Sequence, residues 1–287
     1  MRKFNLIFLL ISMSGTMFAQ NHRFVYEYAF KIDSLNREHI TKEVMNLDVT
    51  KEGSNFYSNE KYIYDSIMNS EFKRNVAVGS TVIDFSKVKN NSKVGSSVTK
   101  THPGFETVLH TSINGDKYGL VSTEKYDWKI GPETQELHGY KVQKATTQSS
   151  GRKWIAWFAS DIQIQDGPYK FNGLPGLILK VSDDKNDHVF NFIGSKTLNE
   201  VPAKPVSRGP KELIITAQNF NQLWKDYLKD PSRKIRQMFS DTEITLIKVT
   251  DANGRELSQS EIIRNKEKRV KEQLKTTNNF LELSLYR

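Results

Sequence analysis

The sequence predicts a mainly β protein of the α+β class, in which a few helices pack on a strongly curved antiparallel sheet. Three observations support this: many short segments alternate apolar and polar residues, turn residues separate them closely, and helical periodicity gathers near the C-terminus. Parallel βαβ units are not expected, because no helical segment separates the central strands. By analogy alone, such a sheet with helices in its concavity would be similar to half-barrel carriers of the periplasm.

The composition fits a folded globular protein: the chain has 287 residues, of which 37% are hydrophobic and 26% are charged. Lys and Arg number 42 against 33 Asp and Glu, so the net charge is +9 and anionic partners are open. Charge alone does not select among them. The chain has no cysteine, which excludes disulfides, thiolate metal sites and cysteine nucleophiles.

Residues 1–19 are predicted to be a cleaved secretory signal peptide. A basic start and an apolar run over residues 4–11 precede a small and polar stretch that ends at Ala19. The run is far shorter than the ~20 apolar residues of a membrane-spanning helix, so a retained anchor is the weaker alternative. We therefore expect a single mature domain over residues 20–287, periplasmic or secreted and without a transmembrane segment.

The first part of the mature chain predicts a hairpin and a helix after an opening strand. Residues 23–32 alternate with period two, which is typical of an antiparallel strand with one buried face. Residues 43–50 and 55–58 flank a turn in which Gly53 is expected to supply a positive φ. Residues 59–72 place apolar side chains four positions apart, which predicts a short amphipathic helix that packs on the sheet.

Short strands are expected to continue through the middle of the chain. Their predicted ranges are 81–85, 106–113, 118–123, 128–130, 140–147, 153–158, 177–181, 188–193 and 243–250. The turns between them carry Asn114-Gly115 and Ser150-Gly151, pairs that adopt the positive φ of tight hairpins. This regular spacing favours a meandering antiparallel sheet.

Helices are expected in the last third of the chain. The residues predicted to cap them are Thr216, Ser232 and Ser258. Glu261 stands three residues after the last of these, which forms a capping box and opens a helix over residues 259–276. We expect that helix to lie against the sheet with its charged face in water. Leucines alternate over residues 281–285, which predicts a final strand.

The densest unusual stretch covers residues 166–181. Pro175 pre-sets φ at the first central position of a turn and Gly176 provides a positive φ at the second, which predicts a type II turn before a strand. Gly173, Leu174, Pro175 and Gly176 are therefore interpreted as a structural turn, because glycine, proline and apolar side chains offer no acid, base or ligand.

Residues 173–178 read Gly-Leu-Pro-Gly-Leu-Ile, which is the hexapeptide that names the GLPGLI family of exported proteins from Gram-negative bacteria. The chain also resembles this family at residues 47–50, 64–67, 128–134, 139–145, 151–158 and 167–171. It departs from many relatives at Val142, where they carry a cysteine, so no role of that thiol carries over. The family has no established activity, so the resemblance implies an export route and not a reaction.

An aromatic groove near the motif is the binding-site hypothesis. The side chains expected to line the groove or its mouth are Arg152, Trp154, Trp157, Asp166, Tyr169, Lys170 and Phe171. Aromatic rings supply apolar contact area and the charged groups would orient a ligand. The predicted function is a non-catalytic binding or accessory protein for a peptide, a lipid or an outer-membrane partner. The alternative is that these residues only close the sheet over its core.

No familiar zinc, phosphate-loop or dinucleotide motif occurs, so no catalytic residue, metal or cofactor is assigned. The competing hypothesis is an envelope hydrolase or metal-dependent enzyme whose site the fold assembles, for example from His138 or His188 with Asp166. Acidic residues at 183–188 lack calcium-loop spacing and fit a solvated turn better. The basic cluster at 264–275 contains glutamates, which favours a solvated helix face over a nucleic-acid site. The oligomeric state is not predicted.

Overall fold

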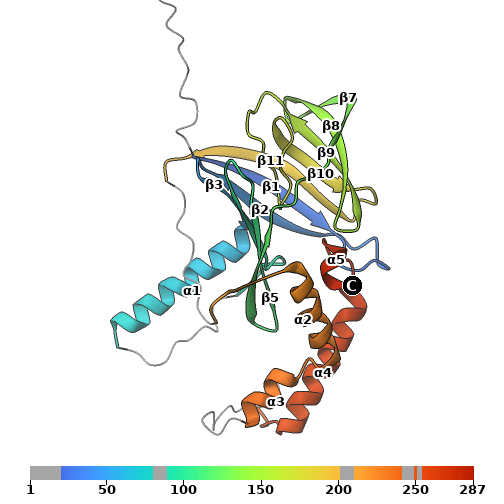
Figure 1. Cartoon of the computed structure of the whole chain (residues 1–287). Coiled ribbons are helices and arrows are strands. Elements are labelled where there is room, and N and C mark those ends of the chain that lie inside the picture. The colour runs from blue at the N-terminus through green and yellow to red at the C-terminus, as the bar shows by residue number, and fades with distance from the viewer. Residues whose placement is uncertain (1–20, 80–88, 201–209, 241–248, 251–253) are drawn as a thin grey trace, which may run out of the picture.

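The computed structural model describes residues 21–79, 89–200, 210–240, 249–250 and 254–287. Within these residues it contains a 12-stranded open sheet and five helices (Figure 1). The strands are β1 (Asn21–Phe30), β2 (Thr41–Val49), β3 (Gly53–Ser58), β4 (Ser97–Thr101), β5 (Thr107–Ile113), β6 (Asp116–Ser122), β7 (Lys129–Leu137), β8 (Tyr140–Ser149), β9 (Arg152–Ala159), β10 (Leu177–Asp183), β11 (His188–Leu198) and β12 (Leu213–Ile215). The helices are α1 (Asn59–Ala77), α2 (Ala217–Lys229), α3 (Arg233–Ser240), α4 (Gln259–Thr276) and α5 (Leu283–Tyr286).

The strand order is β12-β6-β5-β4-β3-β2-β1-β11-β10-β9-β8-β7. The β1 strand lies in the interior of the sheet, where it pairs with β2 on one side and with β11 on the other, both antiparallel. The predicted mainly β, antiparallel-rich architecture is thus confirmed. The pair of β12 with β6 is parallel and was not predicted. The predicted strand at 81–85 and all but the last two residues of the one at 243–250 lie outside the described residues.

Two parts of the sheet differ from the sequence prediction. The β4 strand was missed because its inward-facing residues are Val98 and Lys100, and a buried lysine breaks the apolar alternation that marks a strand. The β7 strand, predicted over residues 128–130, continues to Leu137 with almost every residue exposed. Pro132 and a register shift accompany it, and both are features that protect an exposed sheet edge from pairing with another chain.

The predicted hairpin turns form. Asn114 and Gly115 have φ values of 51° and 89°, and Ser150 and Gly151 have 53° and 82°. Gly53 has the expected positive φ, 159°. A Cβ atom at Gly53 would also lie 2.1 Å from the carbonyl oxygen of Lys100, so the close approach of β4 is a second reason for glycine at this position.

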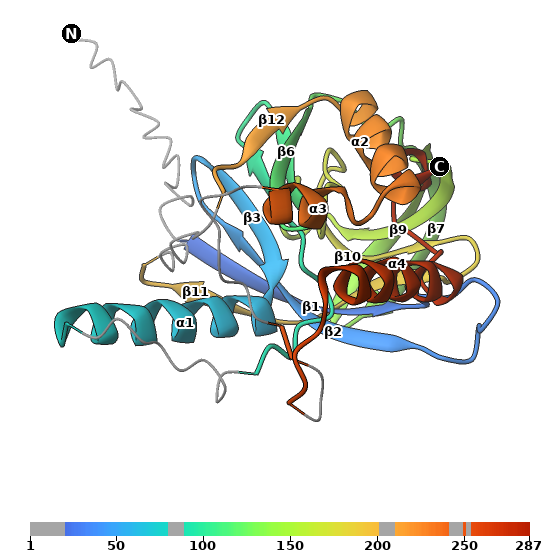
Figure 2. The same ribbon diagram turned by 90° about the horizontal axis from the view of Figure 1, so that it is seen from below.

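The α1 helix does not pack on the sheet as predicted. It begins with Ser58, whose side chain accepts from the backbone N–H of Lys61, and it contacts β2 and β3. From there it extends away from the sheet (Figures 1 and 2), and none of its residues is buried. Ile63 and Ile67 are each 44% exposed, because the apolar side chains of α1 do not gather on one face.

Of the C-terminal helices (Figure 2), α2 packs on the sheet as predicted, with the buried ring of Phe220 against Tyr118 of β6. The predicted caps hold at α2, where the Thr216 hydroxyl accepts from the N–H of Asn219, and at α4, where Ser258 and Glu261 form the capping box. The predicted cap by Ser232 was wrong: its hydroxyl donates to the Ile263 carbonyl oxygen at 3.2 Å and joins α3 to α4.

The end of the chain also differs from the prediction. The α4 helix contacts α3 and buries Val270 alone among its residues, instead of lying along the sheet. The predicted strand over residues 281–285 is wrong, because residues Leu283–Tyr286 form the short helix α5, which packs on α2. None of the helices in the described part of the chain is long and apolar enough to cross a membrane.

One face of the sheet carries the core. Its largest fully buried side chains include Tyr26 from β1, Phe56 from β3, Phe190 from β11 and Phe158 from β9. The Tyr26 ring meets Phe56 edge-on at 6.3 Å between ring centroids, an arrangement that aromatic pairs favour. The aromatic alternation of β1 therefore marks the buried face that the sequence predicts.

Candidate functional site

The loop that connects β9 to β10, residues 160–176, is called the motif loop because it contains most of the hexapeptide. Lys100 of β4 holds this loop against the sheet. Its Nζ lies 2.5 Å from Asp166 Oδ1, and both side chains are fully buried. Nζ also donates to the carbonyl oxygens of Gly167 at 2.7 Å and Tyr169 at 2.9 Å. The lysine therefore satisfies the loop backbone and the carboxylate together.

Asp166 is not at the mouth of a groove, contrary to the sequence hypothesis. Its Oδ1 accepts from the N–H of Gly167 at 2.7 Å, and its Oδ2 lies 3.2 Å from His102 Nε2. Burial raises the pKa of Asp166, but the charge of Lys100 and these hydrogen bonds outweigh it and hold the pKa below its usual range. The carboxylate is thus ionised and buried, with every partner inside the protein.

The predicted type II turn is also wrong. The N–H of Gly176 donates to the Leu174 carbonyl oxygen at 2.8 Å, which closes a three-residue turn around Pro175. The N–H of Leu177 donates instead to Ile162 at 3.1 Å. Gly176 has a φ of 151°, and a Cβ atom there would lie 2.1 Å from the carbonyl oxygen of Ala159. Both the fixed φ of proline and the missing side chain of glycine are therefore needed in this turn.

A cavity of about 380 Å³ lies beside the motif loop, between the core face of the sheet and the chain segment that follows α4. This chain segment, residues 277–281, is called the covering segment. The aromatic side chains that line the cavity are Tyr28, Phe30, Phe56, Tyr169, Phe190 and Phe280. Tyr28 stacks on Phe190 at 4.1 Å and on Phe30 at 4.5 Å between ring centroids. The part of the cavity wall that β1 and β11 supply is therefore aromatic and already packed.

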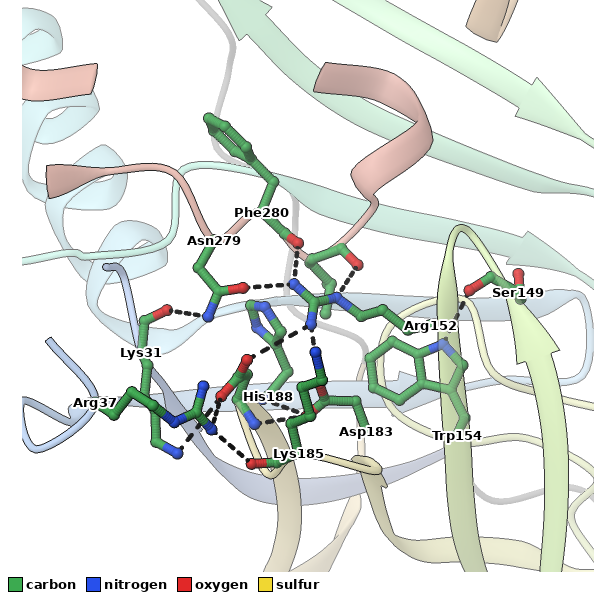
Figure 3. A network of polar contacts seen from close by, with 12 residues as sticks. Lys31, Arg37, Ser149, Arg152, Trp154, Asp183, Lys185, His188, Asn279 and Phe280 are labelled. Atoms are coloured by element: carbon green, nitrogen blue, oxygen red, sulfur yellow. Dashed lines mark hydrogen bonds and ion pairs between the residues drawn. The ribbon is translucent and has the colours of Figure 1, made fainter. Parts of the chain in front are cut away.

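Arg152, at the start of β9, connects the sheet to the covering segment (Figure 3). Its guanidinium donates to Asp183 Oδ2 at 2.8 Å, to Asn279 Oδ1 at 2.8 Å and to the carbonyl oxygen of Phe280 at 2.6 Å. Leu281 accepts a fourth hydrogen bond at 3.2 Å. A guanidinium group is planar and has five N–H donors, so it can bind a carboxylate and the backbone of a second chain segment at the same time.

The acidic stretch after β10 is built into the same network. Asp183 Oδ1 accepts from the N–H groups of Asp187 at 2.6 Å and His188 at 2.9 Å. Asp187 pairs with Arg37 at 2.7 Å. These two carboxylates are buried, whereas Asp184 is exposed. Within the described residues, no group of three or more His, Asp or Glu side chains is placed to hold a metal ion.

His188 borders the cavity and is 2% exposed. Its Nδ1 lies 2.7 Å from the Tyr28 hydroxyl, and its Nε2 is buried without a hydrogen-bond partner. The structure does not bring His188 to Asp166, because Asp166 pairs with His102. His138 lies at the β7–β8 turn, with its ring 5.7 Å from that of Phe192. The fold thus separates the histidines that the enzyme hypothesis joined to Asp166.

The other residues of the hypothetical groove divide among four places. Tyr169 lines the cavity. Trp154 and Phe171 are 2% exposed and pack on each other in the core, with ring centroids 4.8 Å apart. Trp157 points to the opposite face of β9, as the alternation of buried residues along that strand shows. Lys170 Nζ pairs with Glu282 at 2.5 Å.

Most of the residues that form the cavity wall were not predicted as site residues from the sequence. Tyr28 was predicted on the buried face of a strand and Phe190 within a strand, but nothing in the sequence showed that the covering segment leaves a space above them. The one feature of the sequence that could have indicated the cavity is the row of alternating aromatic residues in β1.

A second polar cluster joins β4 and β5 to the segment before β12. His110 Nε2 lies 3.0 Å from Thr99 Oγ1, and His110 Nδ1 lies 2.9 Å from Glu212 Oε1. The histidine and glutamate side chains are 29% and 31% exposed. His110 also borders a polar cavity of about 200 Å³ together with Tyr57 and Lys61. No sequence signal pointed to this cluster, because its members are 11 and 102 residues apart.

Comparisons with known proteins find a local similarity to one family model around the motif loop. The model of a family described as "Protein of unknown function (Porph_ging)" matches residues 147–180, which include the hexapeptide. No curated protein is similar enough to the chain to count as a match. Two similar solved structures are those of PNGF-II in the P21 and C2 space groups, with TM-scores of 0.49 and 0.48 and 15% identity. The similarity covers 71% of this chain and 33% or 32% of theirs, so the chain spans about a third of their length.

Proposed function

We propose that the protein is an exported, non-catalytic binding protein of the GLPGLI type, which holds a small, mainly apolar molecule in the cavity beside the motif loop. The observation that carries this proposal is the aromatic-lined cavity of about 380 Å³. Ligand sites in proteins are commonly concave, apolar and about 300–1,000 Å³ in volume. Of the three ligand classes considered from the sequence, a lipid-like small molecule best fits the aromatic lining of this space.

Several features belong to the same proposal. Residues 1–19 serve as the signal peptide, and residues 20–287 form a single domain in the periplasm or outside the cell. The sheet acts as a strongly curved wall, in the manner of half-barrel carriers. The covering segment closes the other side. It is held by the side chain of Arg152 and by hydrogen bonds of Asn278 and Asn279 to the carbonyl oxygen of Ile32, and not by a sheet ladder. Such a site can release its ligand by moving one short segment while the core stays packed.

The test is a fluorescence titration of residues 20–287 with N-phenyl-1-naphthylamine, an apolar dye that brightens on burial. We expect saturable binding at one site. Leu281→Trp places a larger side chain in the cavity from the covering segment and should abolish binding. Ile193→Trp is the matched control, because Ile193 is 49% exposed on the sheet. Absence of saturable binding, or equal binding by both variants, would contradict the proposal.

The second candidate is an envelope hydrolase, and the cluster of Thr99, His110 and Glu212 favours it. If the Glu212 carboxylate accepts from Nδ1–H of His110, Nε2 is free to accept the hydroxyl proton of Thr99. This is the nucleophile, base and orienting acid arrangement of acyl-transfer enzymes. Thr99→Val and His110→Gln should abolish labelling by a fluorophosphonate probe, and Thr123→Val should not. Equal labelling of all variants would exclude this candidate.

A further inference from the structure

We propose that the basic face of α4 and the exposed loop between β1 and β2 form one surface that docks on an anionic phospholipid bilayer, where the cavity takes up and releases its ligand. This inference rests on the proposed function and adds to it the place of ligand exchange. It starts from basic and apolar side chains that are exposed on two elements bordering the cavity.

The α4 helix carries a row of basic side chains, here called the basic stripe. Its members are Arg264, Lys268, Lys271 and Lys275, and all four are exposed. Their spacing of four, three and four residues follows the helical turn, so they lie on one face over a length of about 16 Å. Val270, the buried residue of α4, lies about 130° from the stripe around the helix axis. The stripe therefore faces away from the packed side of the helix.

Other basic side chains of α3 and α4 have partners inside the protein. Arg236 pairs with Glu267 at 3.4 Å, and Lys266 donates to Asn114 Oδ1 at 3.0 Å. Among the described residues, no side chain of the basic stripe has an ion-pair or hydrogen-bond partner. Glu272 is exposed beside the stripe and offsets only part of its charge. Like charges three and four residues apart destabilise a helix, so an anionic surface that neutralises them would gain affinity.

The loop between β1 and β2, residues 31–40, adds an apolar part to this surface. Leu35, in the middle of the loop, is 87% exposed, and Ile40 is 53% exposed. No other large apolar side chain in the described part of the chain is as exposed as Leu35. A single exposed leucine is ordinary. Next to a row of basic side chains, however, it can enter the boundary between lipid headgroups and acyl chains.

Hydrogen bonds hold this loop beside the end of α4. The N–H of Ser34 donates to Asn278 Oδ1 at 2.9 Å, and Asn278 Nδ2 donates to Asp33 Oδ1 at 3.3 Å. Asn278 lies two residues after α4 ends, at the start of the covering segment. Figure 2 shows the loop, in blue, next to the C-terminal end of α4, in red. The basic stripe and the apolar loop are therefore neighbours, although they are more than 220 positions apart in the chain.

The same two elements border the cavity. Phe30 and Ile32 line it at the point where the loop begins, and Gln273 and Thr277 line it at the end of α4. A bilayer seated on the loop and on the basic stripe would thus adjoin this border of the cavity. An apolar ligand that passes between bilayer and cavity there would expose little of its surface to water, which is the costly part of its transfer.

An anionic bilayer fits both parts of the surface, whereas a soluble polyanion fits only one. A polyanion would neutralise the basic stripe but would offer nothing apolar to Leu35. Phospholipids supply phosphate groups for the stripe and acyl chains for the leucine. Each basic side chain near an anionic surface increases the affinity about fivefold, so four of them give binding that is reversible and sensitive to salt. Reversible docking is what ligand exchange requires.

The experiment measures cosedimentation of residues 20–287 with vesicles of equal parts phosphatidylglycerol and phosphatidylcholine, and with vesicles of phosphatidylcholine alone. We expect binding to the anionic vesicles only, and weaker binding when salt is added. The double variant Lys268→Gln, Lys271→Gln should weaken this binding by about 25-fold, because two basic side chains are lost. Leu35→Ser should weaken it by about tenfold, because the apolar contact is lost.

The matched controls change the same kinds of side chain elsewhere. Lys129→Gln combined with Lys141→Gln removes two exposed charges from β7 and β8. Leu213→Ser removes a leucine that is 57% exposed on β12. Both controls should bind the anionic vesicles as the wild type does. All the changed side chains are exposed, so every variant should fold, which far-UV circular dichroism checks.

The outcomes separate the inference from the proposed function. Equal weakening by the stripe variant and its lysine control would reduce the effect to net charge and overturn the inference. No effect of Leu35→Ser, with equally tight binding of soluble heparin, would make the partner a polyanion and also overturn it. Saturable dye binding in solution without vesicle binding would overturn the inference and leave the proposed function standing. Vesicle binding without dye binding would overturn the proposed function, and with it ligand exchange at this surface.

Discussion

Two buried ion pairs perform different tasks in this molecule. Lys100 and Asp166 join β4 to the motif loop, and both side chains are fully buried. Arg152 and Asp183 are 5% and 1% exposed and join neighbouring strands, but Arg152 also holds the covering segment. The first pair lies in the core, where Lys100 also donates hydrogen bonds to buried backbone carbonyl oxygens of the motif loop. The second holds a segment at the border of a cavity, and under the proposed function this segment is the closure that moves when the ligand leaves.

The difference lies in what remains when the basic side chain is removed. Without Lys100, the Asp166 carboxylate keeps a backbone N–H and His102 but loses its compensating charge. Without Arg152, the Asp183 carboxylate keeps two backbone N–H donors at 2.6 and 2.9 Å. We therefore expect the first loss to affect the whole fold and the second to affect mainly the covering segment.

The largest effect is expected for Lys100→Met, which leaves a buried carboxylate without a cation. It should lower the free energy of unfolding by about 3–5 kcal/mol, measured by urea denaturation at pH 7. Lys153→Met is the control, at an exposed lysine of the same sheet, and should change stability by less than about 0.5 kcal/mol. Adding Asp166→Leu should recover part of the loss. A loss similar to that of the control would show that the pair is not the fixed element described above.

The next largest effect is a pH dependence of the free energy of unfolding, caused by His188 near Arg152. The pKa of His188 is lowered from 6.5 to about 3 by burial, so the folded ring binds fewer protons than the unfolded one. Its contribution to stability is complete above pH 6.5 and is lost as the pH falls towards 3. The loss is about 1.4 kcal/mol per pH unit, or about 3 kcal/mol between pH 6.5 and 4.5.

The measurement is urea denaturation at several pH values in that window, with His188→Asn as the variant that should remove most of the slope. The Lys100 pair should not contribute there, because the pKa of Asp166 is held below 3.8 and its contribution is lost only in stronger acid. An unchanged slope in His188→Asn would mean that other groups titrate on folding.

Arg152→Met should lower the free energy of unfolding by about 2 kcal/mol, because hydrogen bonds to a charged group are lost while Asp183 keeps its backbone donors. Amide hydrogen exchange should rise selectively over residues 277–281. Arg37→Met is the matched control, since Arg37 pairs with Asp187 from a side chain that is 44% exposed. A uniform rise in exchange across the sheet would remove the distinction between the two pairs.

The smallest effect is expected at the far end of α4. Ser258→Ala removes the capping box and should destabilise α4 by about 1 kcal/mol. Because α4 leads into the covering segment, dye affinity should fall slightly while the exchange of β4 stays the same. Gln259→Ala, one residue later, keeps the cap and is the control. Equal effects of the two variants would exclude the cap as the cause.

Local features of the fold could be predicted from the sequence because each depends on neighbouring residues. The turn at Asn114-Gly115 needs two positive φ values, and the capping box needs Ser258 and Glu261 three positions apart. The strand at Leu177–Asp183 follows the motif for the same reason. Such elements are encoded within a few residues, so their periodicity and turn chemistry are sufficient.

The features that the sequence did not predict depend on distant partners. From the sequence alone, Lys100 would be taken for an exposed lysine, because its partner Asp166 is 66 positions later in the chain. The α5 helix was predicted as a strand because alternating leucines fit both states over so short a range. The candidate cavity was missed for the same reason: it lies between β1, β11 and the covering segment, and no local pattern records the space between them.

The position of β1 has a consequence for how the chain reaches its native state. His22 pairs with Val49 on one side of β1 and with Thr197 on the other, so the second ladder joins residues 197 − 22 = 175 positions apart at this point. A chain that emerges N-terminus first can form β1 to β3 early, but one edge of β1 then stays unpaired until β11 appears. Pairing at such sequence separation is slow, and an open edge with aromatic residues invites association with other chains. A holding chaperone that shields this edge would thus matter most before residue 188 has emerged.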